Sequence, residues 1–531
     1  MRLTTEEGTR SPWMDIRVPR FGILPGDRHV DVVVVGAGIT GLTTALMLKR
    51  RGHTVAVIEA ASVGAGETAR STAHLTSVLD GRLSALIKRF GREDAARAVQ
   101  AHGAAIDWIE KTVHEVGIDC GFARVPGHLF CETGDSSGRD VVEKEAEAAA
   151  KLGLAVEPCV DLPLPLSVGT AVRFPRQAQL HPLAYLRGLT TAFVKGDGGT
   201  IYDGTRVVSV DDGEPCRVHT DRGTLTCKAV VLATHVPLNR ILLHAKLEPM
   251  RSYVIARSSE LPDNAGLFWD TADPYHYWRT ARLGDETLLL VGGRDHGVGE
   301  SQDDNFAALE RHARDRLGEA EVRYRWSGQI LEPVDGLAFI GHNSFCTRVF
   351  VATGYSGNGM TGATAAALIL CGEIEGAKHP LAQVFSATRG TPVGSVKGFV
   401  RQNARAAKNV FFDRRRAGTP DNVDDLAPGD GRVVRVDGEP VAVFKKPDGR
   451  LETVSAVCTH LGCVVNFNCA EKTWDCPCHG SRFATDGTVL HGPAVQALAP
   501  HDLDTHDKEG VLVETILRAP RALMGGRPLA E

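Results

Sequence analysis

The segment Val30-Asp-Val-Val-Val-Val35-Gly36-Ala-Gly38-Ile-Thr-Gly41 predicts the architecture of most of this chain. Its first six residues are rich in valine, which is typical of a buried parallel strand, and a helix-like stretch, Leu42–Arg51, follows the glycines. A second apolar strand, Thr54–Ile58, ends at Glu59. Strand, glycine-rich turn, helix, strand and acid in this order predict a Rossmann βαβ unit, a fold that binds dinucleotides.

Each glycine of this fingerprint has a physical role. Gly36 permits a tight turn, Gly38 lets the backbone approach a pyrophosphate, and Gly41 allows the helix to pack closely on the strand. The helix N-terminus supplies free N–H groups and a partial positive charge to the phosphates. Glu59 is expected to accept hydrogen bonds from a ribose diol. A glycine-rich structural turn is the alternative interpretation.

Four later segments decide between FAD and NAD: Gly64–Thr76, Ala229–Thr234, Pro333–Gly341 and Val349–Gly362. Together with the fingerprint, and in this order, they resemble the D-amino-acid oxidase/glycine oxidase superfamily of FAD-dependent amine oxidoreductases over roughly residues 25–385. In that family the last glycine-rich segment points a helix N-terminus at the flavin ring, where it stabilises negative charge. No second GxGxxG–acid unit follows, so no separate NAD(P)H site is visible.

The resemblance implies which residues bind FAD. They come from the fingerprint, the loop after the second strand and the late glycine-rich turn: Gly36, Gly38, Ile39, Thr40, Gly41, Glu59, Arg70, Ser71, Thr72, His74, Thr234, Gly354, Ser356, Gly357, Asn358, Gly359, Met360 and Thr361. Some relatives attach the flavin covalently through a histidine or cysteine in the neighbourhood of His74. A non-covalent role for His74 is the preferred interpretation.

The intervening sequence is expected to form the substrate half. Tyr253, His276, Tyr277 and Arg279 are candidate catalytic or substrate-contacting residues. Aromatic rings can cage an amine, and an arginine can clamp a carboxylate with two hydrogen bonds. The alternative is that these side chains only pack a sheet. The sequence identifies no catalytic base.

A second motif suits the binding of a metal centre. It consists of Cys458-Thr-His460-Leu-Gly-Cys463 and Cys476-Pro-Cys478-His479-Gly-Ser481. The C-x-H and C-x-x-H pairs offer two thiolates and two imidazoles, which is the ligation of a Rieske [2Fe–2S] centre. A structural zinc site is the alternative. The whole pattern resembles the Rieske proteins of respiratory and photosynthetic cytochrome complexes. The expected iron ligands are Cys458, His460, Cys476 and His479.

Three further features accompany these ligands. Zinc does not explain Cys463 and Cys478, which sit just beyond the ligand pairs, where a disulfide can tie the two loops together. Ser481 is placed to donate its hydroxyl to a cluster sulfur, which raises the potential. The cytochrome-complex proteins have a tyrosine two residues later that does the same, whereas this chain has Phe483. The resemblance therefore implies a potential below theirs.

The expected fold class is α/β with an added β domain: a Rossmann-type FAD-binding domain with an inserted α+β substrate domain, then a small all-β Rieske domain. The expected boundaries are an N-terminal extension (1–27), the oxidoreductase (28–385), a basic linker or helix (386–422), the Rieske domain (423–518) and a tail (519–531). Within the oxidoreductase, FAD-binding segments cover about 28–80, 175–245 and 330–385, and substrate segments about 81–174 and 246–329.

The linker has eight Lys/Arg against two acids. Apolar residues at helical spacing in 396–416 allow peripheral contact with a membrane or an acidic redox partner, but an interdomain strap is the favoured interpretation. The net charge of -5 gives no reason to expect nucleic acid as a partner. The first residues contain neither an apolar signal core nor a twin-arginine motif, so a cytoplasmic location is expected.

The combined hypothesis is an FAD-dependent dehydrogenase acting on a small-molecule amine or amino acid. Its electrons would pass singly through the cluster to a one-electron acceptor protein or quinone, because a pure oxidase that uses dioxygen needs no cluster. Two alternatives stay open. The cluster can instead receive electrons from a donor and feed a reductase or an oxygen-activating flavin, or the Rieske module can serve as a non-catalytic docking or redox-sensing domain.

Overall fold

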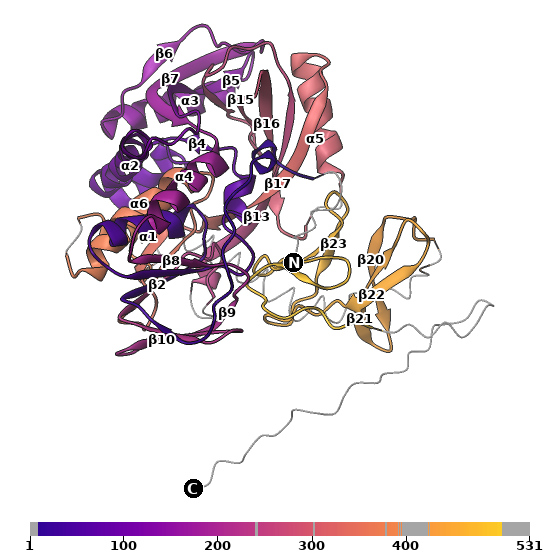
Figure 1. The fold of residues 1–531 in the computed structure, drawn as a ribbon. Helices are drawn as coiled ribbons and strands as arrows, with labels where there is room; N and C mark the ends of the chain where they lie inside the picture. Colours follow the sequence, from indigo (N-terminus) through magenta and orange to yellow (C-terminus); the bar gives the residue numbers. More distant parts are fainter. Residues whose placement is uncertain are drawn as a thin grey trace.

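The computed structural model describes residues 9–238, 243–300, 303–377, 380–390 and 425–501, together with residues 392, 395 and 423. A large body is built from residues up to 390, and a small domain, β20 to β26, lies beside it (Figure 1). Most of the expected linker 386–422, the 396–416 segment and the tail 519–531 lie outside the described residues.

The first layer of the large body is a six-stranded sheet in the order β18-β19-β12-β2-β3-β8. All neighbours pair in parallel except β18 and β19. The strands are β2 (Val32–Val35), β3 (Val55–Ile58), β8 (Gly199–Tyr202), β12 (Ala229–Leu232), β18 (Phe339–His342) and β19 (Val349–Thr353). The four valines of β2 are all buried, as expected for a strand that is covered on both faces.

Helices cover one face of this sheet. They are α1 (Ile39–Arg50), α2 (Leu83–Val116), α4 (Pro182–Val194) and α6 (Gly359–Ile374), which share one apolar core with Val32, Val34, Val55 and Val57. A four-stranded sheet, β1-β11-β10-β9, covers the other face. Its strands are β1 (Arg28–His29), β9 (Val207–Asp211), β10 (Cys216–Thr220) and β11 (Thr224–Cys227).

A nine-stranded, mostly antiparallel sheet forms the other half of the large body, in the order β17-β13-β16-β15-β14-β5-β7-β4 with β6 paired to β7. The strands are β4 (His74–Leu75), β5 (Ala123–Glu132), β6 (Glu157–Cys159), β7 (Val168–Gln179), β13 (Leu247–Ser258), β14 (Leu267–Asp270), β15 (Tyr277–Leu283), β16 (Glu286–Gly297) and β17 (Val322–Pro333). Two further helices pack against it, α3 (Ser136–Lys151) and α5 (Asn305–Leu317), and the short α7 (Ala382–Phe385) packs against β18.

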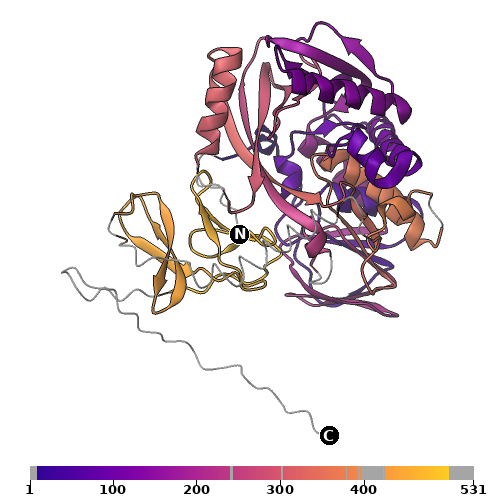
Figure 2. The ribbon, with the colours of Figure 1, turned by 180° about the vertical axis from the view of Figure 1, so that it is seen from behind.

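The small domain consists of two antiparallel sheets. One contains β20 (Gly431–Val436), β21 (Glu439–Lys445) and β22 (Leu451–Ser455), and the other β23 (Asn466–Asn468), β24 (Thr473–Asp475), β25 (Arg482–Phe483) and β26 (Val489–His491). The view from behind shows this domain next to the lower part of the large body (Figure 2). The predicted fold class is confirmed, since an α/β body with an inserted α+β half is followed by a small all-β domain.

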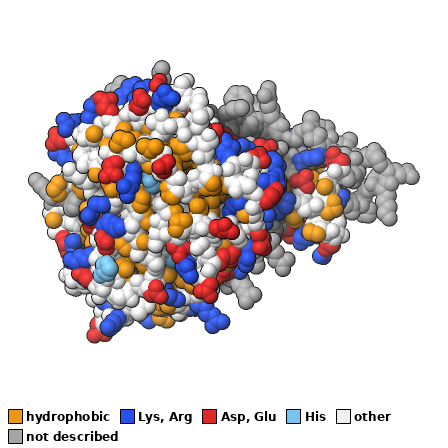
Figure 3. All heavy atoms as spheres, turned by 90° about the horizontal axis from the view of Figure 1, so that it is seen from above, with side chains coloured by type: hydrophobic (Ala, Val, Ile, Leu, Met, Phe, Trp, Pro, Cys, Tyr) orange, Lys and Arg blue, Asp and Glu red, His pale blue; other side chains and the backbone are white. Residues whose placement is uncertain are grey.

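The surface carries mixed charge. On the face seen from above, basic and acidic side chains are interspersed rather than gathered by sign (Figure 3). Among the described residues, no helix is both long and apolar enough to cross a membrane.

Candidate active site and iron–sulfur site

A cavity of about 1600 Å³ lies at the carboxyl ends of β2, β3 and β12 and extends to the small domain. Ligands of open parallel sheets bind at this end of the strands. Most of the predicted FAD-binding residues line it, whereas Gly41, Gly354 and Thr361 do not. Those that line it are Gly36, Gly38, Ile39, Thr40, Glu59, Arg70, Ser71, Thr72, His74, Thr234, Ser356, Gly357, Asn358, Gly359 and Met360.

The turn between β2 and α1 has the shape that a pyrophosphate needs. Gly36 has φ +106°, and a Cβ atom there would lie 2.5 Å from the Ala233 carbonyl oxygen. A Cβ atom on Gly41 would lie 1.9 Å from the Gly36 carbonyl oxygen. Gly38 caps α1 without a side-chain hydrogen bond, so the helix begins with its backbone at the cavity. The sequence here therefore fits a bound dinucleotide.

Glu59 ends β3 and closes the same turn. Its two carboxylate oxygens accept backbone N–H groups from Ala37 at 2.9 Å and from Ala61 at 2.8 Å. Burial raises the pKa of Glu59 above its usual value. Each oxygen keeps a further lone pair for a hydroxyl donor, as the ribose role requires.

His74 and Tyr277 lie where the cavity meets the nine-stranded sheet. The Nε2 atom of His74 lies 3.2 Å from the Trp278 carbonyl oxygen, and Nδ1 lies 3.0 Å from the Thr72 hydroxyl. Because a carbonyl can only accept, His74 Nε2 donates and Nδ1 accepts. Burial and the nearby Arg279 charge lower the pKa of His74 to about 3, so the ring is neutral. The Tyr277 ring meets His74 edge-on.

Carboxylates lie in and beside this part of the cavity, and no motif of the sequence marks them. Asp80 hydrogen-bonds the Tyr275 hydroxyl, and Asp295 hydrogen-bonds Ser252, whose hydroxyl lies 2.8 Å from that of Tyr277. Asp80 and Glu332 line the cavity, whereas Asp295 does not. Burial and the charge of Asp80 raise the pKa of Asp295 to about 7. Burial and several neighbouring carboxylates raise the pKa of Glu332 to about 8.

The other candidate substrate residues do not line the cavity. Arg279 is fully buried, and its two terminal nitrogens donate to the carbonyls of Ala73 at 2.8 Å and Leu180 at 3.2 Å, while its Nε has no partner among the described residues. His276 Nδ1 lies 3.1 Å from an Asp270 carboxylate oxygen. The hydroxyl of Tyr253 accepts a hydrogen bond from Asn468 of the small domain at 3.3 Å.

The four predicted iron ligands lie in two loops of the small domain and form two close pairs, one of cysteines and one of histidines. Cys458 and Cys476 hydrogen-bond each other through their sulfur atoms, and the rings of His460 and His479 meet edge-on with centroids 5.0 Å apart. The Nδ1 atom of His479 is buried and has no hydrogen-bond partner among the described residues. Two soft sulfurs beside two imidazoles, one with a vacant nitrogen, fit a mixed-ligand [2Fe–2S] cluster.

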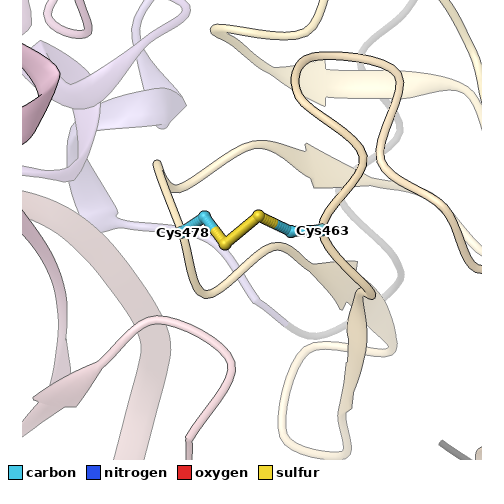
Figure 4. Close-up of a disulfide and its surroundings, with 2 residues drawn as sticks. All are labelled: Cys463 and Cys478. Carbon is cyan, nitrogen blue, oxygen red and sulfur yellow. A yellow bond between two sulfur atoms is a disulfide. The ribbon is translucent and has the colours of Figure 1, made fainter. Parts of the chain in front are cut away.

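A disulfide joins the two ligand loops, between Cys463 and Cys478 (Figure 4). The Cys476 sulfur lies within 4.8 Å of both disulfide sulfurs, which are themselves unavailable to a metal. Ser481 is fully buried and hydrogen-bonds Cys458, while its oxygen accepts the Ala494 N–H at 3.0 Å.

The residue at position 483 is expected to affect the midpoint potential of the cluster. Its ring is fully buried in the core of the small domain. A tyrosine there is expected to add a hydroxyl donor and to raise the midpoint potential. A net hydrogen bond of about 1 kcal/mol corresponds to on the order of 40 mV for a one-electron couple. Redox titration of Phe483→Tyr followed by EPR checks this, with Phe467→Tyr as the control, and an unchanged or lower potential contradicts it.

Buried contacts join the small domain to the large body. The carboxylate of Glu471 accepts hydrogen bonds from Arg251 Nε of β13 at 2.9 Å and from Arg482 Nη2 of its own domain at 2.8 Å. Gln329 of β17 donates to the Gly480 carbonyl at 2.8 Å. The ring of His244, from the large body, lies 5.3 Å from the His460 ring and 5.1 Å from the His479 ring between centroids.

Comparisons with known proteins match both parts of the chain. The family model described as FAD dependent oxidoreductase matches residues 31–372, and the one described as Rieske [2Fe-2S] domain matches residues 420–504. The putative Rieske 2Fe-2S iron-sulfur protein YhfW of Bacillus subtilis is 34% identical over 92% of this chain and 96% of its own length.

Two further similarities concern the larger part. Gamma-glutamylputrescine oxidoreductase of Escherichia coli is 25% identical over 62% of this chain and 80% of its own length. The crystal structure of glycine oxidase from Geobacillus kaustophilus superposes with a TM-score of 0.58 at 20% identity, over 68% of this chain and 99% of that one. That structure shares the fold. The chain therefore belongs to the FAD dependent oxidoreductase family, binds FAD, and carries a Rieske [2Fe–2S] domain after its oxidoreductase domain.

Proposed function

We propose that this protein oxidises a small-molecule amine or amino acid at its carbon–nitrogen bond and passes the electrons singly through its cluster to an external one-electron acceptor. The observation that carries the proposal is the shared cavity. Flavin-domain residues such as Gly36 and His235 line it together with Rieske-domain residues such as His491 and Pro493. The rings of His235 and His491 lie 5.5 Å apart between centroids.

When bound, FAD accepts two electrons as a hydride from the carbon next to nitrogen, and the [2Fe–2S] cluster carries electrons one at a time. The oxidised substrate is an imine, which water hydrolyses to a carbonyl compound and an amine or ammonia. Two molecules of a one-electron acceptor protein, or one quinone, then take the two electrons. The chain's own residues bind and orient the substrate beside the late glycine-rich turn, where Gly357 donates its N–H to Asp80 at 3.2 Å.

The charge of the cavity favours a cationic amine as the substrate. Asp80, Glu248, Asp273 and Glu332 line it together with Trp269, Tyr275 and Tyr277. Carboxylates and aromatic faces both attract an ammonium group. Because Arg279 does not line the cavity, we select Arg82 and Arg89 from the cationic residues that do line it as candidate partners for a carboxylate. The relative named gamma-glutamylputrescine oxidoreductase supports an amine-type substrate.

Matched substrate pairs test this proposal. Each pair consists of an amine and the α-amino acid that differs from it only by the carboxylate, and anaerobic flavin bleaching is followed for both. Faster bleaching with the amines supports a cationic amine as the substrate. Faster bleaching with the amino acids shows that the substrate is an amino acid. If no member of any pair bleaches the flavin, oxidation of amines and amino acids is wrong.

Binding of a permanent cation is expected to strengthen as the pH rises from about 6 to 9. The reason is that two carboxyl groups lose their protons over this range and make the surroundings of the cavity more negative. They are Glu332, which lines the cavity and has a pKa of about 8, and Asp295, which hydrogen-bonds the cavity residue Ser252 and has a pKa of about 7. The measurement is the inhibition constant of a tetraalkylammonium competitor, whose own charge does not titrate. At pH 9, Glu332→Gln is expected to weaken its binding by about 1.5–3 kcal/mol, roughly 10- to 100-fold.

Glu373→Gln is the matched control for this measurement. Burial also raises the pKa of Glu373, but Glu373 does not line the cavity. An inhibition constant that is flat with pH, or equal effects of the two variants, contradicts the proposed cation site.

A further inference from the structure

We propose that His244 of the oxidoreductase domain is the outer hydrogen-bond partner of the cluster ligand His479 and the contact through which the flavin half is coupled to the cluster. The part of the proposal that concerns the route of the electrons rests on the function proposed above. It adds a positioning residue that no motif of the sequence marks.

The contact is buried and involves both ligands. His244 lies in a short 3₁₀ turn, His244–Lys246, just before β13, and the residue is 6% exposed. Its ring centroid lies 5.3 Å from that of His460 and 5.1 Å from that of His479. One side chain of the oxidoreductase domain therefore reaches both imidazoles of the expected iron site.

The hydrogen bonds of His244 leave one nitrogen available. The ring hydrogen-bonds the Pro237 carbonyl, whereas Nε2 is buried and has no partner among the described residues. Nδ1 is therefore the donor to Pro237, and Nε2 of the neutral ring is an acceptor. An unmet acceptor in a buried site is unfavourable unless a donor completes it.

An iron-bound histidine supplies such a donor. The ring nitrogen that does not bind the metal almost always donates its N–H to an outer partner, which fixes the ring and raises its basicity. In His479 the nitrogen without a partner is Nδ1, so ligation through Nδ1 leaves Nε2–H as the donor. The chemistry of the two rings is thus complementary when the cluster is bound.

The fold holds this contact in place and links it to the flavin cavity. Residues Thr234, His235, Val236 and Leu238, shortly before His244, line the cavity. Arg251, in β13 after His244, makes the buried ion pair with Glu471 that fastens the two domains. In each transfer one electron leaves the reduced flavin and converts one ferric iron of the cluster to ferrous, and no bond to His244 forms or breaks.

Three variants of the holoprotein test the proposal. His244→Phe keeps a ring but removes the acceptor, His244→Ala removes the contact without overpacking, and His244→Gln restores a side-chain oxygen as acceptor. The control is His128→Phe, because His128 is also buried with an unpartnered ring nitrogen but stacks on Phe268 in the substrate half. The flavin is reduced photochemically, so the outcome does not depend on the identity of the substrate.

Two readouts are followed, the midpoint potential of the cluster by EPR and the rate of cluster reduction after flavin photoreduction. His244→Phe and His244→Ala are expected to raise the potential, because the ligand imidazole loses an acceptor that enriches it in electrons. They are also expected to slow cluster reduction about tenfold or more, the usual scale for losing an outer partner. His244→Gln is expected to recover both values in large part.

Unchanged potential and rate in His244→Ala, or changes equal to those of His128→Phe, overturn the proposal. If His244→Phe fails to load the cluster, the proposal is tested by comparing the potential and the rate of His244→Ala with those of His244→Gln. A wild-type protein whose flavin is never reduced by amines, but whose cluster follows photoreduced flavin, contradicts the proposed substrate and leaves the role of His244 intact.

Discussion

Replacing Glu471 with glutamine is expected to loosen the Rieske domain from the oxidoreductase domain and to lower the free energy of unfolding by about 3–5 kcal/mol. The carboxylate accepts hydrogen bonds from Arg251 at 2.9 Å and Arg482 at 2.8 Å, and the side chains of these arginines are at most 6% exposed. A neutral amide leaves the buried guanidinium group of Arg251 without its ion-pair partner, while Arg482 keeps the carboxylate of Asp475 at 2.9 Å. Removing one partner of a buried ion pair is costlier than replacing the whole network with apolar groups.

The effect has a definite pH dependence. Burial alone raises the pKa of Glu471, but Arg251, Arg482 and Arg70 outweigh burial and hold the pKa well below its usual value. The stability that this carboxylate contributes is therefore complete above the ordinary glutamate pKa and is lost as the pH falls below it. In Glu471→Gln, the acid-dependent part of the unfolding curve should shrink.

Calorimetry of the loaded protein measures this loss, and the rate of cluster reduction after flavin photoreduction measures the loosening of the domains. Asp425→Asn is the control, because it breaks an exposed ion pair with Arg432 at 3.2 Å in the same domain. Such a pair is worth about 0–1 kcal/mol. If Glu471→Gln unfolds no earlier than Asp425→Asn, the buried network does not fasten the domains.

Replacing His479 with alanine is expected to abolish the [2Fe–2S] cluster while leaving FAD bound. His479 and Cys476 come from one loop. Without the His479 imidazole, one iron of the cluster lacks a ligand and is open to solvent and acid. His479 does not line the FAD cavity, so flavin binding should survive. Iron and sulfide analysis with EPR checks the first expectation, and the bound flavin absorbance checks the second.

The same variant separates catalysis from electron exit. Photochemical reduction of its flavin should proceed at the wild-type rate, while transfer to a one-electron acceptor should fall to the background level. Cys469→Ser is the control, since Cys469 forms no disulfide and is no expected ligand. One zinc and no iron per wild-type chain would contradict the cluster and favour the structural zinc site.

The parts of the site that the sequence predicts are those encoded locally. The turn around Gly36 and Gly41 depends on a few consecutive residues and one close backbone contact, and its spacing is legible without a structure. The cysteine and histidine pairs likewise bring their donors together over one or two intervening residues. In both cases the chemistry follows from short-range geometry.

Residues that depend on position along a strand are harder to assign. Tyr277 and Arg279 are two residues apart in β15 and share a face of the sheet. Tyr277 lines the cavity, but Arg279 does not. The guanidinium group of Arg279 instead donates hydrogen bonds to the carbonyls of Ala73 and Leu180. Local sequence cannot show where along a strand a cavity stops.

Residues brought together from distant segments leave no local pattern. Asp80, Asp295 and Glu332 come from three segments more than 30 residues apart, and His244 stands alone in the sequence. Their roles depend on how the nine-stranded sheet closes over the FAD site and on how the Rieske domain docks. Only the three-dimensional structure places them beside the reacting groups.

The most direct test of the proposed electron path is an anaerobic titration of the loaded wild-type protein with an amine that bleaches its flavin. Visible absorbance follows the flavin, and EPR follows the reduced cluster in the same samples. The EPR signal of the reduced cluster is expected to grow as substrate is added, with no other reductant present. Complete reduction of the flavin while the cluster stays oxidised would contradict the proposed electron path.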